Sequence, residues 1–243
     1  MEKAAIVTGA SRGIGKEIAR ALAKEGYNLA LFCRKNKDML DAFADELQND
    51  YGITVLTYAG LISDHDFVEF SIKDAIQKFG RVDVLVNNAG RASIGLLTDM
   101  TYEMWDEMIA TNLSSMFYTC KSVVPQMVAQ KSGRIINISS MWGTVGASCE
   151  VAYSAAKGGV NSFTKALGKE LSPSNIAVNA IACGVVDTDM NSMLTADEKA
   201  QLSAEIPAGR FCSPAEIAQT LVQLLKAPSY MTGQVIGVDG GYI

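Results

Sequence analysis

The chain of 243 residues has a formal net charge of −5, and hydrophobic residues make up 49% of it. This composition is typical of a compact globular protein and excludes a disordered chain. The acidic balance, without a cluster of lysine and arginine, gives no basis for binding nucleic acid or an anionic membrane surface. The amino terminus does not resemble a signal peptide and no apolar run reaches transmembrane length, so we expect a cytoplasmic protein.

Short apolar runs alternate with longer amphipathic stretches along the whole chain. Strands are predicted at residues 4–8, 28–33, 54–58, 82–86, 134–138, 177–181 and 235–238. Helices are predicted at residues 14–25, 37–50, 65–79, 104–130, 152–171 and 214–225. This alternation is typical of a parallel sheet with helices on both faces, so we predict one doubly wound α/β domain over residues 1–243.

Residues 188–210 do not follow this alternation. They come after the sixth predicted strand, and apolar residues such as Met190 and Met193 stand there among polar ones. We predict a helical flap over a cleft, and the alternative is a helical hairpin at the periphery.

The first predicted strand runs directly into a turn with the pattern Gly-x-x-x-Gly-x-Gly, after which the helical pattern begins. Glycines allow a tight reversal and the close approach of a pyrophosphate, whose charge would meet backbone N–H groups and the helix dipole. A position between a first strand and a first helix is the context that this mechanism requires. The candidate dinucleotide-binding residues in this turn are Gly9, Ser11, Arg12, Gly13, Ile14 and Gly15.

The end of the second predicted strand indicates which dinucleotide binds. An acidic residue there would accept hydrogen bonds from the adenosine ribose, but this chain has the uncharged Cys33 followed by Arg34. Arg34, together with Arg12, suits a 2′-phosphate. We therefore expect NADP(H) to be preferred over NAD(H).

Metal and triad chemistry find little support in the sequence. The five cysteines are odd in number and far apart, without a Cys-x-x-Cys pair, so neither a disulfide framework nor a zinc site is indicated. His65 is the only histidine, which disfavours a Ser-His-Asp triad. We expect no metal, and acid-base catalysis would need another residue.

Tyr153 and Lys157 offer such a group. On a helix their spacing of four residues places phenol and ammonium on one face, with Ser140 upstream in the chain. A nearby cation stabilises a phenolate, so the pair can bring proton transfer toward neutral pH. The spacing alone would equally fit a half-exposed aromatic ring and a solvated lysine. The glycine turn in the same chain favours the catalytic interpretation.

With these motifs the chain resembles the short-chain dehydrogenases/reductases over nearly its whole length. The resemblance rests on the glycine turn, on Asn87-Asn88-Ala89-Gly90, on Asn112, Ser140, Tyr153 and Lys157, and on Val238-Asp239-Gly240-Gly241. It implies a Rossmann-like sheet with strand order 3-2-1-4-5-6-7. It also implies an NAD(P)-dependent oxidoreductase that interconverts CH–OH and C=O groups.

The resemblance also implies a role for each matching residue. Tyr153 would protonate the carbonyl oxygen as hydride arrives, and Ser140 would hydrogen-bond that oxygen. Lys157 would lower the tyrosine pKa and bind the nicotinamide ribose, while Asn112 would hold a water linking Lys157 to solvent. The remaining cofactor contacts implied are Asn88, Ala89 and Gly90 on the adenosine and ribose side, and Val186 and Thr188 beside the carboxamide and phosphates.

Two positions depart from the family pattern. Leu61 stands where many relatives have an Asp that contacts adenine, which puts that hydrogen bond in doubt. Cys183-Gly184 replaces the usual Pro-Gly after the sixth strand and places a thiol near the expected nicotinamide. Packing is the favoured role for Cys183, and a thiol open to alkylation is the alternative.

Within the family, the sequence is most similar to bacterial 3-oxoacyl-[acyl-carrier-protein] reductases, through its compact length, its 206–210 segment and its short carboxyl terminus. Of two basic residues expected near the cleft mouth for docking an acyl carrier protein, one is present as Lys131 and the other is replaced by Ser174. The expected substrate pocket is apolar and suits an acyl chain or a steroid. Its candidate residues are Ile94, Ser140, Met141, Trp142, Tyr153, Gly184, Val185, Met190 and Met193.

Two other functions remain open. The same chemistry could act on a free ketone or secondary alcohol, such as a hydroxysteroid or a small carbonyl. A catalytically silent NADP-binding protein is the third possibility, against which the complete catalytic set argues. The resemblance also implies a homotetramer built through the helices that carry Asn112 and Tyr153, where small residues such as Ala155 and Gly159 would permit close packing.

Overall fold

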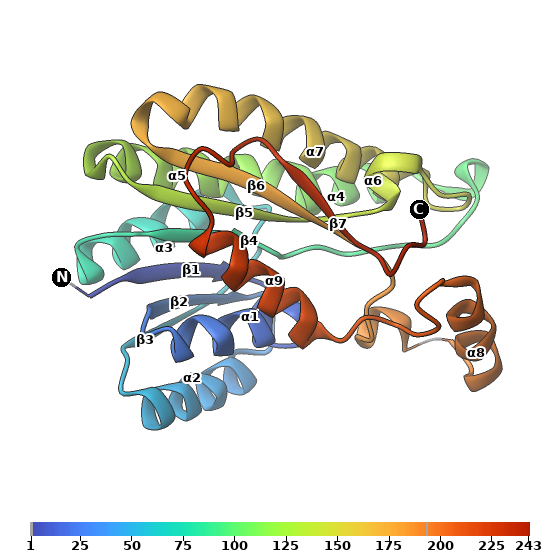
Figure 1. The fold of residues 1–243 in the computed structure, drawn as a ribbon, viewed down its shortest axis with the longest axis horizontal. Helices are drawn as coiled ribbons and strands as arrows, with labels where there is room; N and C mark the ends of the chain where they lie inside the picture. The colour runs from blue at the N-terminus through green and yellow to red at the C-terminus, as the bar shows by residue number, and fades with distance from the viewer. Residues whose placement is uncertain (1, 193) are drawn as a thin grey trace.

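In the computed structural model, which describes residues 2–192 and 194–243, seven strands form one parallel sheet (Figure 1). The strands are β1 Ala4–Thr8, β2 Asn28–Cys33, β3 Val55–Ala59, β4 Val84–Asn87, β5 Gly133–Ser140, β6 Ile176–Cys183 and β7 Val235–Val238. Their order is β3-β2-β1-β4-β5-β6-β7, which confirms the predicted topology. Strand β1 pairs with both β2 and β4, so the direction of winding reverses there. A crevice at the carboxyl ends of the strands is expected at such a point.

Helices cover both faces of the sheet (Figure 1). They are α1 Gly13–Lys24, α2 Lys37–Tyr51, α3 His65–Phe79, α4 Tyr102–Ile109, α5 Ser115–Gln130, α6 Trp142–Val145, α7 Val151–Leu171, α8 Ala196–Glu205 and α9 Pro214–Lys226. Helices α1, α2 and α9 contribute to one apolar core, and α3, α5 and α7 contribute to the other. Among the described residues, no helix is both long and apolar enough to cross a bilayer.

Alternating residues of the central strand serve the two cores. Ile6 packs in one core and Val7 in the other, and both are fully buried. Side chains of a strand alternate between faces, so a strand covered on both sides needs a continuous apolar run. This requirement explains why β1 and β2 are recognisable in the sequence.

The predicted helix at 104–130 is wrong as one uninterrupted element. Helix α4 ends at Ile109, a π-helical turn occupies Ala110–Ser114, and α5 begins at Ser115. A π-turn holds one more residue than an α-turn and is frequent at functional sites. Asn112 lies in the middle of this turn.

The predicted flap contains helix α8, which stands apart from the sheet at the end where the strands finish (Figure 1). Thr195 and Glu198 form a capping box that fixes its start. None of the described residues of α8 is buried. Met193, predicted to belong to the flap and the pocket wall, lies outside the described residues.

Candidate active site

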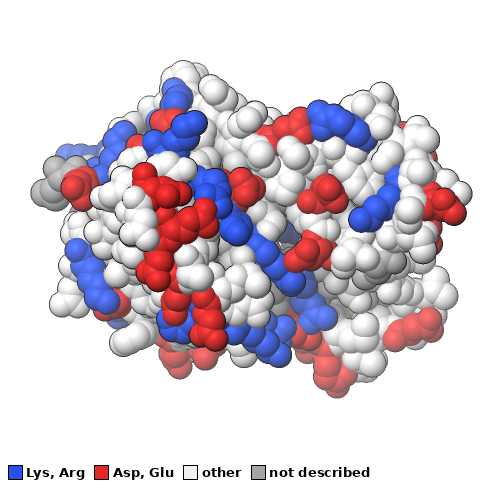
Figure 2. All heavy atoms as spheres, turned by 90° about the horizontal axis from the view of Figure 1, so that it is seen from below, with Lys and Arg blue, Asp and Glu red and all other residues white. Residues whose placement is uncertain are grey.

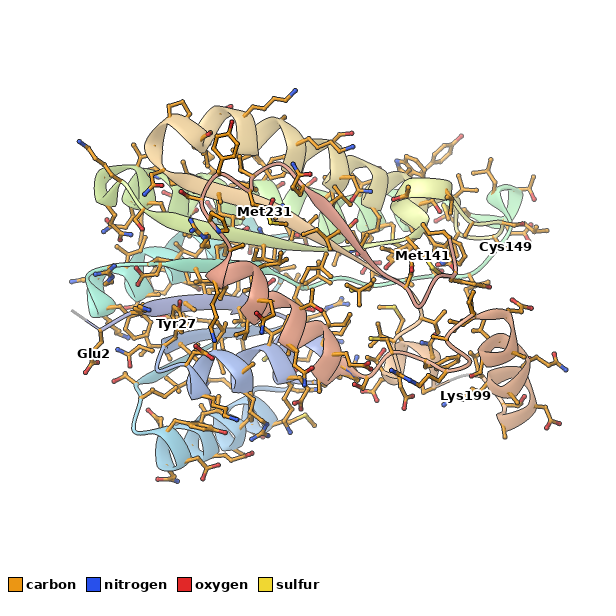
Figure 3. All side chains as sticks on the ribbon, viewed as in Figure 1. Glu2, Tyr27, Met141, Cys149, Lys199 and Met231 are labelled. Carbon is orange, nitrogen blue, oxygen red and sulfur yellow. The ribbon has the colours of Figure 1, made fainter. Side chains whose placement is uncertain are left out.

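The predicted site residues gather at one edge of the sheet, because the strands are parallel and finish together. The glycine turn follows β1, residues 88–90 follow β4, Ser140 ends β5 and Gly184 follows β6. Figure 3 shows Met141, Cys149 and Lys199 at this end of the molecule and Glu2 at the other. From below, the molecule has a furrow between two lobes, along which lysine and arginine gather with carboxylates beside them (Figure 2).

The turn after β1 can be made only by glycine at three positions. Gly9 and Gly13 have φ of +67° and +55°, in the left-handed region that disfavours residues with a side chain. A Cβ on Gly15 would lie 2.2 Å from the Gly9 carbonyl oxygen and 2.5 Å from Asn88 Nδ2. The chain is therefore shaped to let its backbone approach a ligand closely.

Thr8 and Asn88 lock this turn to the loop after β4. The Thr8 hydroxyl accepts hydrogen bonds from the Asn88 and Ala89 N–H groups at 2.9 and 3.0 Å. In return, Asn88 Nδ2 donates to the Thr8 and Gly9 carbonyl oxygens at 2.9 and 3.1 Å. Sequence analysis gave the Thr8 hydroxyl no role, and its only signal was a polar residue ending an apolar strand. Asn88 thus stabilises the turn through its side-chain amide.

The start of α1 fits an anionic group. Arg12 precedes the helix in extended conformation, and among the described residues no side chain caps the first N–H groups of α1. Free N–H groups at a helix start, together with the helix dipole, favour phosphate. Thr188 lies against this turn, since a Cβ on Gly13 would come within 3.4 Å of its methyl group. The glycine cradle, the uncapped helix and Thr188 fit the pyrophosphate of a dinucleotide.

Two ion pairs join arginines that follow β1 and β2 to other parts of the chain. Arg12 pairs with Asp189 of the flap at 3.2 Å, and Arg34 pairs with Glu107 of α4 at 3.8 Å. Cys33 is buried, and Leu61 is exposed at the end of β3. The segment that follows β2 therefore begins with Arg34, and no acid stands at position 33.

Tyr153 and Lys157 lie on α7, with the Lys157 Nζ 5.6 Å from the centre of the tyrosine ring. The ammonium donates a hydrogen bond to the Ile138 carbonyl oxygen at 2.8 Å. Burial lowers the pKa of Lys157 to about 8, while the neighbouring Cys183 acts in the opposite direction. Burial also raises the pKa of the Cys183 thiol to about 12, so this cysteine fits the packing role.

The expectation that Lys157 lowers the pKa of Tyr153 is not met in this structure. Burial raises the pKa of the phenol above its ordinary value, and the opposing effect of a hydrogen bond with Ser140 is smaller. The ammonium is directed to Ile138, not to the phenol oxygen. Tyr153 is therefore protonated at neutral pH, as a proton donor must be.

Asn112 is connected to the site through the loop after β4. Its Nδ2 donates to the Arg91 and Met108 carbonyl oxygens at 3.0 and 3.1 Å, and its Oδ1 accepts the Arg91 N–H at 3.2 Å. A Cβ on Gly90 would lie 2.6 Å from Asn112 Oδ1 and 3.7 Å from Lys157 Nζ. The structure thus brings Asn112 and Lys157 to the same glycine.

The candidate substrate residues differ in exposure. Met141 is buried, and its N–H donates to the Cys183 carbonyl oxygen at 2.9 Å. Ile94 and Met190 are exposed by 64% and 47%, so their side chains are free to meet a ligand. Gly184 packs against the Asp239 backbone, where a Cβ would come within 2.6 Å.

The carboxyl-terminal segment makes contacts near the site that sequence analysis did not predict. Tyr242 packs its ring 6.0 Å from that of Trp142 and donates a hydrogen bond to Glu205 of α8 at 2.8 Å. Gly240 accepts a hydrogen bond from the Ala208 N–H at 3.0 Å. Tyr242 therefore links the end of α8 to the start of α6. The aromatic residue directly after the family's Gly-Gly ending was the available signal.

The expected position of the two docking residues is wrong within this chain. Lys131 precedes β5 and Ser174 precedes β6, so both lie at the edge of the sheet where the strands begin. The side chain of Asn175 donates to the Lys131 carbonyl oxygen at 3.2 Å, which places the two positions close together. The length of β5, roughly 23 Å at the usual rise per residue, separates them from Ser140.

The fold and this site together define a family. The chain matches the family model of the short chain dehydrogenases over residues 3–199, and it belongs to this family of oxidoreductases, which bind a nicotinamide cofactor. The resemblance inferred from the motifs is confirmed. Among residues 2–192 and 194–243, no group of three or more His, Cys, Asp or Glu side chains is placed to hold a metal ion.

Individual relatives cover almost the whole chain. The uncharacterized oxidoreductase YmfI of Bacillus subtilis is 41% identical over 243 residues, spanning 100% of this chain and 99% of that protein. A 3-oxoacyl-[acyl-carrier-protein] reductase, FabG, of Staphylococcus aureus is 41% identical over 242 residues, spanning 99% and 98%.

Solved structures show the same fold. YwfH, an NADPH dependent reductase involved in bacilysin biosynthesis, superposes with a TM-score of 0.93 at 26% identity, covering 100% of this chain and 99% of that one. An actinorhodin polyketide ketoreductase with NADPH superposes with a TM-score of 0.92 at 34% identity, covering 99% and 97%.

Proposed function

We propose that the protein is an NADPH-dependent reductase that converts a 3-oxoacyl group on acyl carrier protein to the 3-hydroxyacyl group. The observation that carries the chemistry is the meeting of Ser140, Tyr153 and Lys157 at the carboxyl edge of the sheet, beside the glycine cradle. The 3-oxoacyl-[acyl-carrier-protein] reductase relatives support the choice of substrate.

In this proposal the four matching residues have different tasks. The bound cofactor would supply the hydride that reaches the carbonyl carbon. Tyr153, whose pKa is raised by burial, gives its proton to the carbonyl oxygen, and Ser140 fixes that oxygen by a hydrogen bond. Lys157 would donate a hydrogen bond to the nicotinamide ribose. Asn112 holds the loop after β4 and a water that links Lys157 to solvent.

The cofactor would lie along the furrow. Residues 9–15 would hold its pyrophosphate, and residues 88–90 would line the adenosine and ribose side. Val186 and Thr188 would flank the carboxamide and phosphates, and the position of Thr188 against Gly13 supports its part in this. The NADPH named for YwfH and for the actinorhodin ketoreductase supports a preference for the phosphorylated cofactor.

Arg34 would select the 2′-phosphate. We expect Arg34→Gln to raise the KM for NADPH by about tenfold and to change the KM for NADH much less, because only NADPH has the phosphate that the guanidinium meets. Lys35→Gln is the matched control, since it removes the neighbouring positive charge. Equal losses with both cofactors would refute this role for Arg34.

A second candidate is the same reduction on a free ketone, or the oxidation of a secondary alcohol such as a hydroxysteroid. The absence of a basic residue at Ser174 and the distance of Lys131 from Ser140 favour it. Rates with a 3-oxoacyl-carrier-protein thioester, the matching CoA thioester and a ketosteroid would decide between the candidates. A clear preference for the steroid would overturn the first.

We also propose a homotetramer through α5 and α7. Phe117 and Val128 on α5 are exposed by 49% and 40%, which leaves apolar surface for a second copy. The small residues of α7 differ in their surroundings. Gly159 packs against Leu113 of its own chain, whereas Ala155 is exposed and could contact a second copy. Sedimentation of the wild type and of Phe117→Arg tests the assembly, and a wild-type monomer at micromolar concentration would refute it.

A further inference from the structure

One carboxylate on α4 is shared by two arginines. Glu107 of α4 receives Arg91 Nη1 on Oε2 at 2.5 Å and Arg34 Nη2 on Oε1 at 3.8 Å. Each arginine therefore uses a different oxygen of the same carboxylate. Arg34 comes from the loop after β2 and Arg91 from the loop after β4, so the cluster joins the two loops that border the adenosine end.

We propose that Glu107 is a specificity-determining residue for the cofactor, whose carboxylate competes with the 2′-phosphate for Arg34 and so limits the preference for NADPH over NADH. This inference rests on the proposed role of Arg34. In it, Arg91 is a positioning residue that holds the carboxylate and leaves Arg34 the longer, weaker contact.

The geometry supports competition of moderate strength. The side chains of Arg34 and Glu107 are 57% and 46% exposed, so their ion pair is solvated and screened. A phosphate carries more charge than a carboxylate and can bind a guanidinium through two oxygens. The phosphate therefore displaces Glu107 from Arg34, but part of its binding free energy is lost in doing so.

Arg91 is fixed independently of this ion pair. The Asn112 side chain bonds to its N–H and its carbonyl oxygen, so the main chain stays in place when its guanidinium is removed. Without Arg91, Arg34 is the only arginine of the cluster with which Glu107 can pair, so the contact between Glu107 and Arg34 should become stronger. Removal of Arg91 and removal of Glu107 should consequently shift NADPH binding in opposite directions.

Titration of the nicotinamide fluorescence of NADPH and NADH, without a carbonyl substrate, tests this inference. We expect Glu107→Gln to tighten NADPH binding about three- to fivefold at low salt and to leave NADH within about twofold. Asp106→Asn is the control, because it removes the same charge from the adjacent position of α4. We expect Arg91→Gln to weaken NADPH binding by a similar factor, and the double variant to bind nearly as Glu107→Gln does.

Each result has a distinct meaning. If Glu107→Gln and Asp106→Asn tighten NADPH equally, general charge accounts for the effect and the inference fails. It fails also if NADH weakens in Glu107→Gln, or if Arg91→Gln tightens NADPH. If the wild type itself prefers NADH and Arg34→Gln has no effect, the proposed cofactor preference fails first, and the variants distinguish that outcome.

Discussion

The side chain of Asn112 bonds to both main-chain polar groups of Arg91, to the N–H at 3.2 Å and to the carbonyl oxygen at 3.0 Å. These bonds attach the π-turn between α4 and α5 to the loop that follows β4. Since Gly90 lies between Asn112 and Lys157, the attachment sets the width of the site at that point.

Asn112→Ala should therefore loosen the loop after β4. We expect a loss of about 1–3 kcal/mol in the free energy of unfolding, because buried main-chain groups lose their partners, and faster amide exchange at Arg91. Urea denaturation and hydrogen exchange measure the two effects. Asn36→Ala, an exposed asparagine before α2 whose side chain makes no capping bond among the described residues, is the control. Unchanged exchange at Arg91 would contradict the prediction.

Tyr153→Phe should abolish turnover while leaving NADPH binding intact. The change removes only the phenol oxygen, so we expect kcat to fall by at least about 10²-fold, as for the loss of a general acid. Steady-state kinetics and cofactor fluorescence measure the two properties. Tyr102→Phe removes the same oxygen from a residue that is 89% exposed and should have no effect. Substantial remaining activity would rule out Tyr153 as the proton donor.

Lys157 makes the stability depend on pH in a predictable direction. The unfolded chain keeps this proton up to the ordinary lysine pKa of 10.5, whereas the folded protein releases it at about 8. Between these values the unfolded state binds more protons, so the free energy of unfolding attributable to Lys157 rises with pH. Below pH 8 both states are protonated and the cost of burying the ammonium is fully present.

Comparison with Lys157→Met isolates this effect. We expect the wild type to gain stability relative to the variant as the pH rises from 8 to 10.5, by at most roughly 3 kcal/mol. Urea denaturation of both proteins across this range measures it. Lys165→Met, which removes an exposed lysine from the same helix, should give a flat difference. A flat difference for Lys157→Met as well would contradict the buried ammonium.

Gly15→Ala should prevent cofactor binding or folding. Its Cβ would lie 2.2 Å from the Gly9 carbonyl oxygen, a distance that only movement of the backbone can relieve. Gly95→Ala is the control, because no described atom lies within 4 Å of that Cβ and the position needs no positive φ. Thermal unfolding and NADPH titration compare the two. Wild-type binding by Gly15→Ala would show that the turn does not need this glycine.

The positions of the strands could be predicted because each central strand is buried on both faces, whereas their order was implied only by the family resemblance. Such a strand is a short apolar run bounded by glycine or polar residues, as at β1 and β2. The π-turn could not be predicted in this way. Helices α4 and α5 each have helical periodicity, so residues 104–130 read as one helix although the extra residue shifts the phase between them.

The chemistry of the site could likewise be predicted only in part. The glycine turn and the Tyr153-Lys157 spacing are local patterns, and parallel topology brings them together. The direction of the Tyr153 pKa shift depends on how deeply the phenol is buried and where the ammonium points, which spacing does not specify. Nor does the sequence show that Glu107 reaches Arg34 and Arg91, since three separate segments meet there.

The π-turn at Ala110–Ser114 also changes the helical phase. Successive residues of an α-helix are rotated by about 100°, so the one additional residue turns α5 by that angle relative to a direct continuation of α4. Helix α4 can thereby direct Glu107 to the arginines, while α5 directs Cys120, Val123 and Met127 into the core that it shares with α3 and α7. Deleting one residue from the turn would misalign one of these two faces, whichever helix kept its place.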